Sequence, residues 1–258
     1  MAMLASERAP LSEPFRNRSI GAGEPIIVRR TNGDIRGGPV VERAALFSGM
    51  LPGDYASITA AARVKEFARD ETIYFEGDPA HRVVLLISGF AKIAKIGSSG
   101  AEVILRFSAP GDLLGAVGVF STGRHCTTAR AFRACRVLVW EAPVFKSLVD
   151  RFPVLHQTMA RILGTELMEL EERFREVATE RVGQRVASQL LRLMDKMGRP
   201  VNGAIEVDLS REDLAQMTGT TLFTVSRLLS AWEAEGMVRP RREVVTICDV
   251  QSLRAVSE

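Results

Sequence analysis

Residues 210–236 constrain the fold of this chain more than any other stretch of the sequence. Ser210 and Asp213 have the spacing of a helix capping box, and Gly219 is suited to end the helix that they begin. The inner side of this helix is formed by Leu214, Ala215 and Met217. A second amphipathic pattern follows, and its buried side is formed by Val225, Leu228, Leu229 and Trp232. Two short helices joined by a tight turn predict a helix-turn-helix.

The second helix is expected to begin at Thr220 or Thr221, and its outer side is rich in hydroxyl groups. This outer side consists of Thr220, Thr221, Phe223, Thr224, Ser226 and Arg227. In proteins that read the major groove, the N-terminal part of the second helix meets the base edges, and arginine can bond guanine through two hydrogen bonds. We therefore expect this face to bind double-stranded DNA.

A basic hairpin is expected directly after the second helix. Residues 237–238 and 244–247 have β-type composition and flank Arg239, Arg241 and Arg242. Arginines on such a wing would contact phosphates and set the register on DNA without reading the sequence. From residue 180 onward the chain carries 11 basic and 11 acidic residues, so total charge does not distinguish a winged helix from a helix pair with a solvated basic turn. The interpretation as a winged helix depends on where the arginines lie.

A narrow apolar stripe with heptad spacing runs along the helix expected at residues 153–180. The stripe is formed by Leu163, Leu167, Leu170, Phe174 and Val177. Such a stripe is typical of a coiled coil, so we expect this helix to hold two copies of the chain together as a homodimer. The alternative, in which the stripe packs on the chain's own N-terminal half, stays open because the pattern is only about three heptads long.

Short β-type runs separated by turn residues fill the region between residues 72 and 140. Several short strands at close spacing are typical of a jelly-roll barrel, and the glycine-dense run 111–118 lets the backbone approach a ligand. The expected fold class is therefore α+β, with four parts. These are a flexible N-terminal extension (1–42), a sensor β-roll (43–152), a dimerisation helix (153–180) and a winged helix-turn-helix (181–258).

Composition excludes several classes of protein. The net charge is only +3, and no apolar run is long enough for a membrane helix. Neither a signal peptide nor a paired cysteine framework is recognisable, so we expect a cytoplasmic protein that does not contact membranes. None of the catalytic motifs of hydrolases, phosphate-binding loops or zinc proteases is present, and none of the three histidines belongs to such a motif. We expect a protein that is not an enzyme.

The order of these features resembles the Crp/Fnr family, that of the cyclic-AMP receptor protein and the fumarate and nitrate regulator. The residues that carry the resemblance are the Pro-Gly-Asp turn at 110–112, the heptad helix, Leu-Ser-Arg-Glu-Asp-Leu-Ala at 209–215 and Thr-Val-Ser-Arg at 224–227. The resemblance covers about residues 44–250. It implies a cyclic-nucleotide-binding-type β-roll that senses a signal, a dimer that binds a palindromic operator, and contact with RNA polymerase.

Several family residues are missing from the expected effector pocket. Cyclic-nucleotide-binding members have a glutamate for the ribose and an arginine for the phosphate, whereas Ala116 and Cys126-Thr127 stand at the corresponding positions here. Arg124 lies two residues too early, and Leu170 takes the place of a hydroxyl residue that contacts adenine. The expected pocket comprises Gly115, Ala116, Val117, Gly118, Arg124, Cys126, Thr127 and Leu170. We expect no cyclic AMP binding there.

Other cofactors of the family are also not expected. Residues 1–125 contain no cysteine, which excludes the iron-sulfur branch, and the run 115–118 holds no haem ligand. Cys126 and Cys135 are expected to face each other across a hairpin, where they are either a thiol sensor or small buried residues. We predict no cofactor and no metal.

Phe223 stands where the family commonly has a glutamate that helps to read a C:G pair, and this change leaves two functions to compare. In the first, the chain is a sequence-specific transcriptional regulator, and Phe223 touches a thymine methyl group. In the second, the β-roll serves as a sensor or interaction module that has lost specific DNA binding. Arg227 and the basic wing favour the first. The sequence leaves the effector, the operator, the target genes, the choice between activation and repression, and the role of the extension open.

Overall fold

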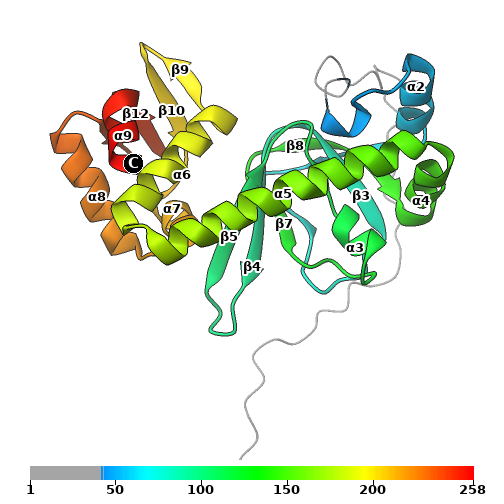
Figure 1. Cartoon of the computed structure of the whole chain (residues 1–258), viewed down its shortest axis with the longest axis horizontal. Coiled ribbons are helices and arrows are strands. Elements are labelled where there is room, and N and C mark those ends of the chain that lie inside the picture. Colours follow the sequence, from blue (N-terminus) through cyan, green and yellow to red (C-terminus); the bar gives the residue numbers. More distant parts are fainter. Residues whose placement is uncertain (1–41, 43) are drawn as a thin grey trace, which may run out of the picture. The chain divides into compact units, whose positions relative to one another are not determined.

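The computed structural model describes Glu42 and residues 44–258 (Figure 1). The N-terminal extension expected at residues 1–42 lies outside this part, apart from Glu42. The structure confirms the predicted fold class, with antiparallel sheets in the N-terminal half, a long central helix, and helices around a third sheet in the C-terminal half. No helix in the described part is long and apolar enough to cross a membrane.

Two four-stranded antiparallel sheets form the β-roll. One has the order β1-β8-β3-β6 and the other β2-β7-β4-β5. The strands are β1 (Arg63–Phe67), β2 (Thr72–Tyr74), β3 (Arg82–Ser88), β4 (Ala91–Ile96), β5 (Glu102–Ser108), β6 (Leu113–Leu114), β7 (Thr128–Ala131) and β8 (Cys135–Glu141). Alternating residues of both sheets, including Val84, Leu86, Ile93 and Val137, meet in a buried cluster between them. This packing closes the roll around its own core.

Short helices surround the roll. They are the 3-10 helix η1 (Ala45–Phe47), α2 (Pro52–Ala60), α3 (Ala116–Phe120) and α4 (Ala142–Arg151). A second buried cluster joins them to the roll around Trp140, whose indole Nε1 donates to the carbonyl of Ile58 at 2.8 Å. Phe145 and Leu155 belong to the same cluster, and this anchors the start of the next helix, α5 (Pro153–Thr179). Proline at its first position suits the beginning of that helix.

The C-terminal part contains four helices and one antiparallel sheet of order β11-β12-β10-β9. Its elements are α6 (Val182–Met197), β9 (Arg199–Val201), β10 (Ala204–Asp208), α7 (Arg211–Thr218), α8 (Leu222–Ala234), β11 (Val238–Pro240), β12 (Val244–Ile247) and α9 (Val250–Ser257). Leu190, Leu214, Val225 and Trp232 are buried in one core that joins these helices to the sheet. The helix-turn-helix therefore rests on a rigid base.

The predicted hairpin that would bring Cys126 opposite Cys135 is wrong. Strand β7, which follows Cys126, pairs with β2 and β4, whereas Cys135 begins β8 in the other sheet. Cys126 is exposed, while Cys135 is buried and its Sγ donates to the carbonyl of Phe90 at 3.2 Å. Burial raises the pKa of the Cys135 thiol to about 11. Cys135 is thus an inert part of the core rather than a reactive thiolate.

Candidate DNA interface and effector cavity

The second helix of the helix-turn-helix, α8, presents one face to solvent. Thr221 caps its N-terminus by accepting a hydrogen bond from the Thr224 amide at 3.2 Å, and Val225, Leu229 and Trp232 face the core. Of the residues expected to touch DNA, Thr221, Phe223 and Arg227 are exposed, whereas Thr220, Thr224 and Ser226 are partly buried. The exposed residues lie on the side of α8 opposite its buried face, which is the arrangement that a major-groove reader needs.

Caps and a buried arginine fix the angle between α7 and α8. The Asp213 amide donates to the Ser210 hydroxyl at 3.0 Å, and Gly219 ends α7 with a φ of 62°, a left-handed backbone that favours glycine. The Arg185 guanidinium, which is buried, donates to the carbonyls of Thr218 at 3.2 Å and Glu180 at 2.9 Å. These bonds satisfy the end of α7 and tie it to α6. No pattern in the sequence indicates this role for Arg185.

The wing is an antiparallel hairpin of β11 and β12, with Arg239 opposite Thr246. The Arg241 amide donates to the Val244 carbonyl at 2.7 Å and closes the turn. Arg239, Arg241 and Arg242 are all exposed. Because β12 also pairs with β10, the hairpin belongs to the four-stranded sheet and holds these guanidinium groups beside the helix-turn-helix. The location of the charges fits contact with phosphates.

A cavity of about 380 Å³ lies between the β-roll and the middle of α5. Seven of the eight residues expected at the effector pocket line it: Gly115, Ala116, Val117, Gly118, Cys126, Thr127 and Leu170. Most of the remaining wall is apolar and comes from strands β4 to β6 and from α5. These apolar residues are Ile93, Leu105, Leu113, Met159, Ile162, Leu163 and Leu167.

Arg124, the eighth expected residue, does not line the cavity. Its guanidinium donates to the Gly77 carbonyl at 2.6 Å, and its backbone forms a bridge to Pro79. This arrangement fixes the loop so that Arg124 does not replace the phosphate-binding arginine of the family. Spacing along the sequence could not reveal it, because Arg124 and Gly77 are 47 residues apart.

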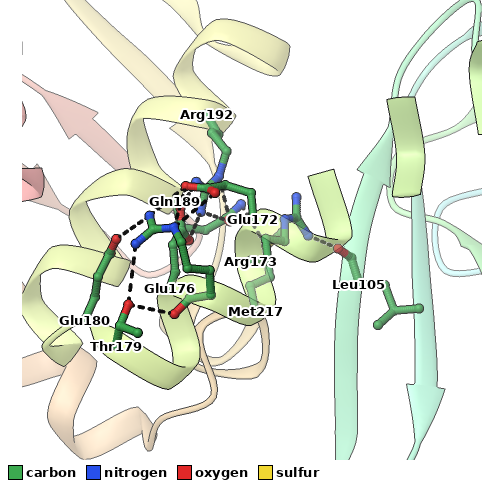
Figure 2. A network of polar contacts seen from close by, with 10 residues as sticks. Leu105, Glu172, Arg173, Glu176, Thr179, Glu180, Gln189, Arg192 and Met217 are labelled. Atoms are coloured by element: carbon green, nitrogen blue, oxygen red, sulfur yellow. Dashed lines mark hydrogen bonds and ion pairs between the residues drawn. The ribbon is translucent and has the colours of Figure 1, made fainter. Parts of the chain in front are cut away.

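The arginines that do line the cavity are already paired. The Arg106 guanidinium forms an ion pair with the Glu166 carboxylate at 2.8 Å, and Arg173 donates a hydrogen bond to the Leu105 carbonyl (Figure 2). Glu169 also lines the wall, so the charged groups here are two arginines and two glutamates. Among the described residues of the wall, Arg106 has a carboxylate partner, whereas the guanidinium of Arg173 contacts a neutral carbonyl. Ala116 has no side-chain acceptor for a ribose hydroxyl.

Tyr74 and His125 close one end of the cavity as a stacked pair, with ring centroids 3.8 Å apart and an angle of 10° between the rings. Burial raises the pKa of the Tyr74 hydroxyl to about 12 and lowers the pKa of His125 below its ordinary value. Both rings are therefore neutral at pH 7. Gly115 precedes α3 with a φ of 78°, and a Cβ atom there would lie 2.9 Å from the Arg82 carbonyl oxygen and 3.1 Å from the His125 ring, so this position favours glycine. Within the described residues, no group of His, Cys, Asp or Glu gathers as a metal site.

The heptad stripe is open to solvent within one chain. Leu167 is 55% exposed and Phe174 is 76% exposed, and Leu163, Leu170 and Val177 are exposed as well. The side of α5 that packs on the roll instead uses Leu155 and Met159. Within one chain, the stripe is therefore left largely uncovered.

Comparisons with known proteins identify both halves of the chain. The cyclic nucleotide-binding domain model matches residues 64–152, and the Crp-like helix-turn-helix domain model matches residues 184–256. The CRP-like cAMP-activated global transcriptional regulator of Mycobacterium tuberculosis is 28% identical over 216 residues, which are 83% of this chain and 96% of that protein. The global nitrogen regulator of Synechococcus elongatus is 28% identical over 190 residues, or 72% and 85% of the two chains.

A solved structure agrees with this assignment. FixK2 from Bradyrhizobium japonicum has a TM-score of 0.67 and 25% identity, with 76% of this chain and 98% of that chain covered. The likeness thus spans the β-roll, the long helix and the helix-turn-helix in one order. Together with the two domain models, it shows that this chain belongs to the Crp/Fnr family of transcriptional regulators and carries a helix-turn-helix DNA-binding domain.

Proposed function

We propose that the chain acts as a homodimer that binds a palindromic operator under the control of a small molecule in the β-roll. The observation that carries this proposal is the double use of α5. Leu163, Leu167 and Leu170 belong to the exposed heptad stripe and also line the cavity. A molecule that enters the cavity therefore touches the residues through which a second copy would pack. The division into a sensor (43–152), a dimerisation helix (153–180) and a DNA-binding domain (181–258) follows from this.

Dimerisation is supported by the cost of leaving the stripe in water. The five side chains of the stripe are partly exposed, and burying the rest of their apolar surface stabilises a complex by a fraction of the roughly 1.5 to 3 kcal/mol that full burial of each provides. A second copy presents the same stripe and is the self-complementary partner that two-fold symmetry provides. Two helix-turn-helix units related by that axis imply half-sites about 34 Å apart. Contact with RNA polymerase is the further partner that family membership leads us to expect.

The chemistry of the cavity supports a mostly apolar effector. Its lining holds equal numbers of arginines and glutamates, of which Arg106 and Glu166 form an ion pair, and the remaining lining is dominated by aliphatic side chains. An anionic ligand would lie beside Glu166 and Glu169, which repel it, whereas an apolar ligand would displace water from the aliphatic wall. We infer that the effector carries little charge and is not a cyclic nucleotide.

Selection of bound sequences from random DNA with the full chain tests the proposal. We expect a symmetric operator whose two halves are separated by one helical turn, and weaker binding when either half is scrambled. The Phe174→Glu variant is the control, because it disrupts the stripe without changing the cavity lining. Scrambling one half of the operator should not weaken its binding further. Recovery of no sequence preference would instead support the sensor or interaction module that does not bind specific DNA.

A further inference from the structure

Two large apolar side chains, Leu222 and Phe223, form the first turn of α8 and face solvent. Leu222 is 52% exposed and Phe223 is 76% exposed. Val225, Leu229 and Trp232 supply the buried side of the same helix, so the core does not need the exposed pair. Adjacent exposed apolar side chains of this size are typical of a surface that is covered by a partner.

The polar groups around this pair are engaged within the helix-turn-helix. The hydroxyls of Thr221 and Thr224 lie 3.0 Å apart as a hydrogen bond, and Thr221 also caps the helix. No acidic residue lies in the first turn of α8. Arg227, one turn later, is exposed and has no ion-pair partner among the described residues. The tip of α8 therefore offers an apolar surface followed by the exposed guanidinium of Arg227.

The major-groove edges of the bases include one group that could pack against such an apolar surface. In the major groove, the C5 methyl group of thymine is the apolar feature, while the other edge groups donate or accept hydrogen bonds. A carboxylate would accept a hydrogen bond from cytosine N4, which neither Leu222 nor Phe223 can do. A 5-methylcytosine presents a methyl group at the same ring position as thymine.

We propose that Leu222 and Phe223 read a C5-methyl pyrimidine in each half-site, beside the guanine that Arg227 contacts. The proposal deepens the function proposed above and depends on it, since α8 must lie in the major groove. It assigns a specificity-determining role to the pair: the side chains bury the methyl group and desolvate the base step, whereas Arg227 supplies the hydrogen bonds. A cytosine without the methyl group should be discriminated against.

The experiment compares versions of one operator that differ by single methyl groups. Thymines of the selected operator are replaced one at a time by deoxyuridine, which removes only the methyl group, and then by cytosine and 5-methylcytosine. Each half-site should contain one thymine at which deoxyuridine matters. Replacing that thymine in one half-site should weaken binding about threefold to fourfold, because the complex then no longer buries one methyl group. Replacement in both halves should weaken it about tenfold. At that position, 5-methylcytosine should bind more tightly than cytosine.

Variants connect this effect to the side chains. Phe223→Ala should bind the thymine and deoxyuridine operators equally, and Leu222→Ala should reduce the difference between them. Arg227→Ala should keep the difference while losing preference at its guanine. As a matched control, Leu51→Ala removes a similarly exposed apolar side chain at the start of α2 and should leave the difference unchanged.

Each outcome separates this inference from the proposed function. An operator that tolerates deoxyuridine at every thymine would overturn methyl reading while leaving DNA binding intact. Equal effects in the wild-type chain and in Phe223→Ala would also overturn it, because the discrimination would then come from DNA shape. Failure to select any operator would count against the proposed function itself, and with it against this inference.

Discussion

The guanidinium of Arg192 on α6 donates two hydrogen bonds to the carboxylate of Glu176 on α5, at 2.5 and 2.8 Å (Figure 2). Glu176 is buried, and Gln189 accepts a further bond from the same guanidinium. Planar pairing of this kind is directional, so it sets the angle at which α6 leaves α5. Since α5 carries the stripe and α6 begins the DNA-binding domain, this pair relates the orientation of the domain to that of the stripe.

Glu176→Gln should destabilise the protein more than Glu172→Gln does. The Glu176 carboxylate is buried, and removal of its charge leaves a partly buried arginine with a weaker partner, a cost of about 1 to 3 kcal/mol in the free energy of unfolding. Glu172 pairs with Arg175 three residues away on the exposed surface of α5, where water and salt screen the pair and its contribution to stability is small. Denaturant unfolding of both variants measures the difference. Equal destabilisation would show that the connection between α5 and α6 does not depend on this pair.

Replacement of Leu167 and Leu170 by glutamate should produce monomers that do not bind the symmetric operator. Two carboxylates on each helix would face two others across the expected axis, and the apolar packing would be removed. Sedimentation measures the oligomeric state. Phe174→Glu, outside the cavity lining, should have the same effect, while Met168→Glu, on an exposed position outside the stripe, should not. A dimer that survives all of these changes would place the interface elsewhere.

Cyclic AMP should fail to saturate the protein in calorimetry at concentrations up to about 1 mM. A dissociation constant of about 1 mM corresponds to a binding free energy of about 4 kcal/mol, so we expect weaker binding than that. Ala116 and Cys126 replace two charged partners, and each hydrogen bond to a charged group is worth about 1.5 to 3 kcal/mol. Saturation at low micromolar nucleotide would mean that Arg106 exchanges Glu166 for the phosphate. The Arg106→Gln variant would then bind the nucleotide much more weakly.

How far the sequence predicts this molecule depends on the range of the interactions involved. The helices α5, α6, α7 and α8 were predictable because periodicity, a leading proline, capping residues and Gly219 are local signals. The lining of the cavity was predictable where residues follow one another along residues 115–118. The sequence does not indicate that Arg106, Glu166 and His125 meet at the cavity, because they come from a strand, a helix and a loop that only the tertiary fold brings together. Cys126 and Cys135 were paired wrongly because a chain reversal can join two sheets as well as two neighbouring strands.

The pH dependence of stability should report on His125. Burial lowers its pKa in the folded protein below the ordinary value of 6.5, with a smaller contribution from His81, whereas Asp78 acts in the opposite direction. The unfolded chain therefore binds more protons as the pH falls through 6.5, and folding stability should decrease as the pH falls from about 7.5 through 6.5 and below. Denaturant midpoints across this range measure the effect. His125→Phe should flatten the curve while keeping the stack on Tyr74, and an unchanged slope would assign the dependence to another group.

Arg227 is expected to read a base, so its replacement should change the sequence preference of the protein. Arg227→Ala should cost about 1 to 3 kcal/mol on the operator and relax discrimination at one guanine in each half-site, because the guanidinium is expected to bond base edges. Titrations of operator variants that differ at each guanine measure this preference. A variant that keeps the full preference would show that Arg227 does not read a base.

The arginines of the wing should affect DNA binding in a different way. Arg241→Ala or Arg242→Ala should weaken all sequences alike, and each should reduce the salt slope by about one for every phosphate that is no longer neutralised, since a phosphate carries no base information. Titrations of operator and scrambled DNA at several salt concentrations separate this effect from that of Arg227. Arg239→Ala should behave in the same way, because its exposed guanidinium lies on the same hairpin. A wing variant that weakens the operator but not scrambled DNA, or a single half-site bound as tightly as the full operator, would contradict this account of recognition.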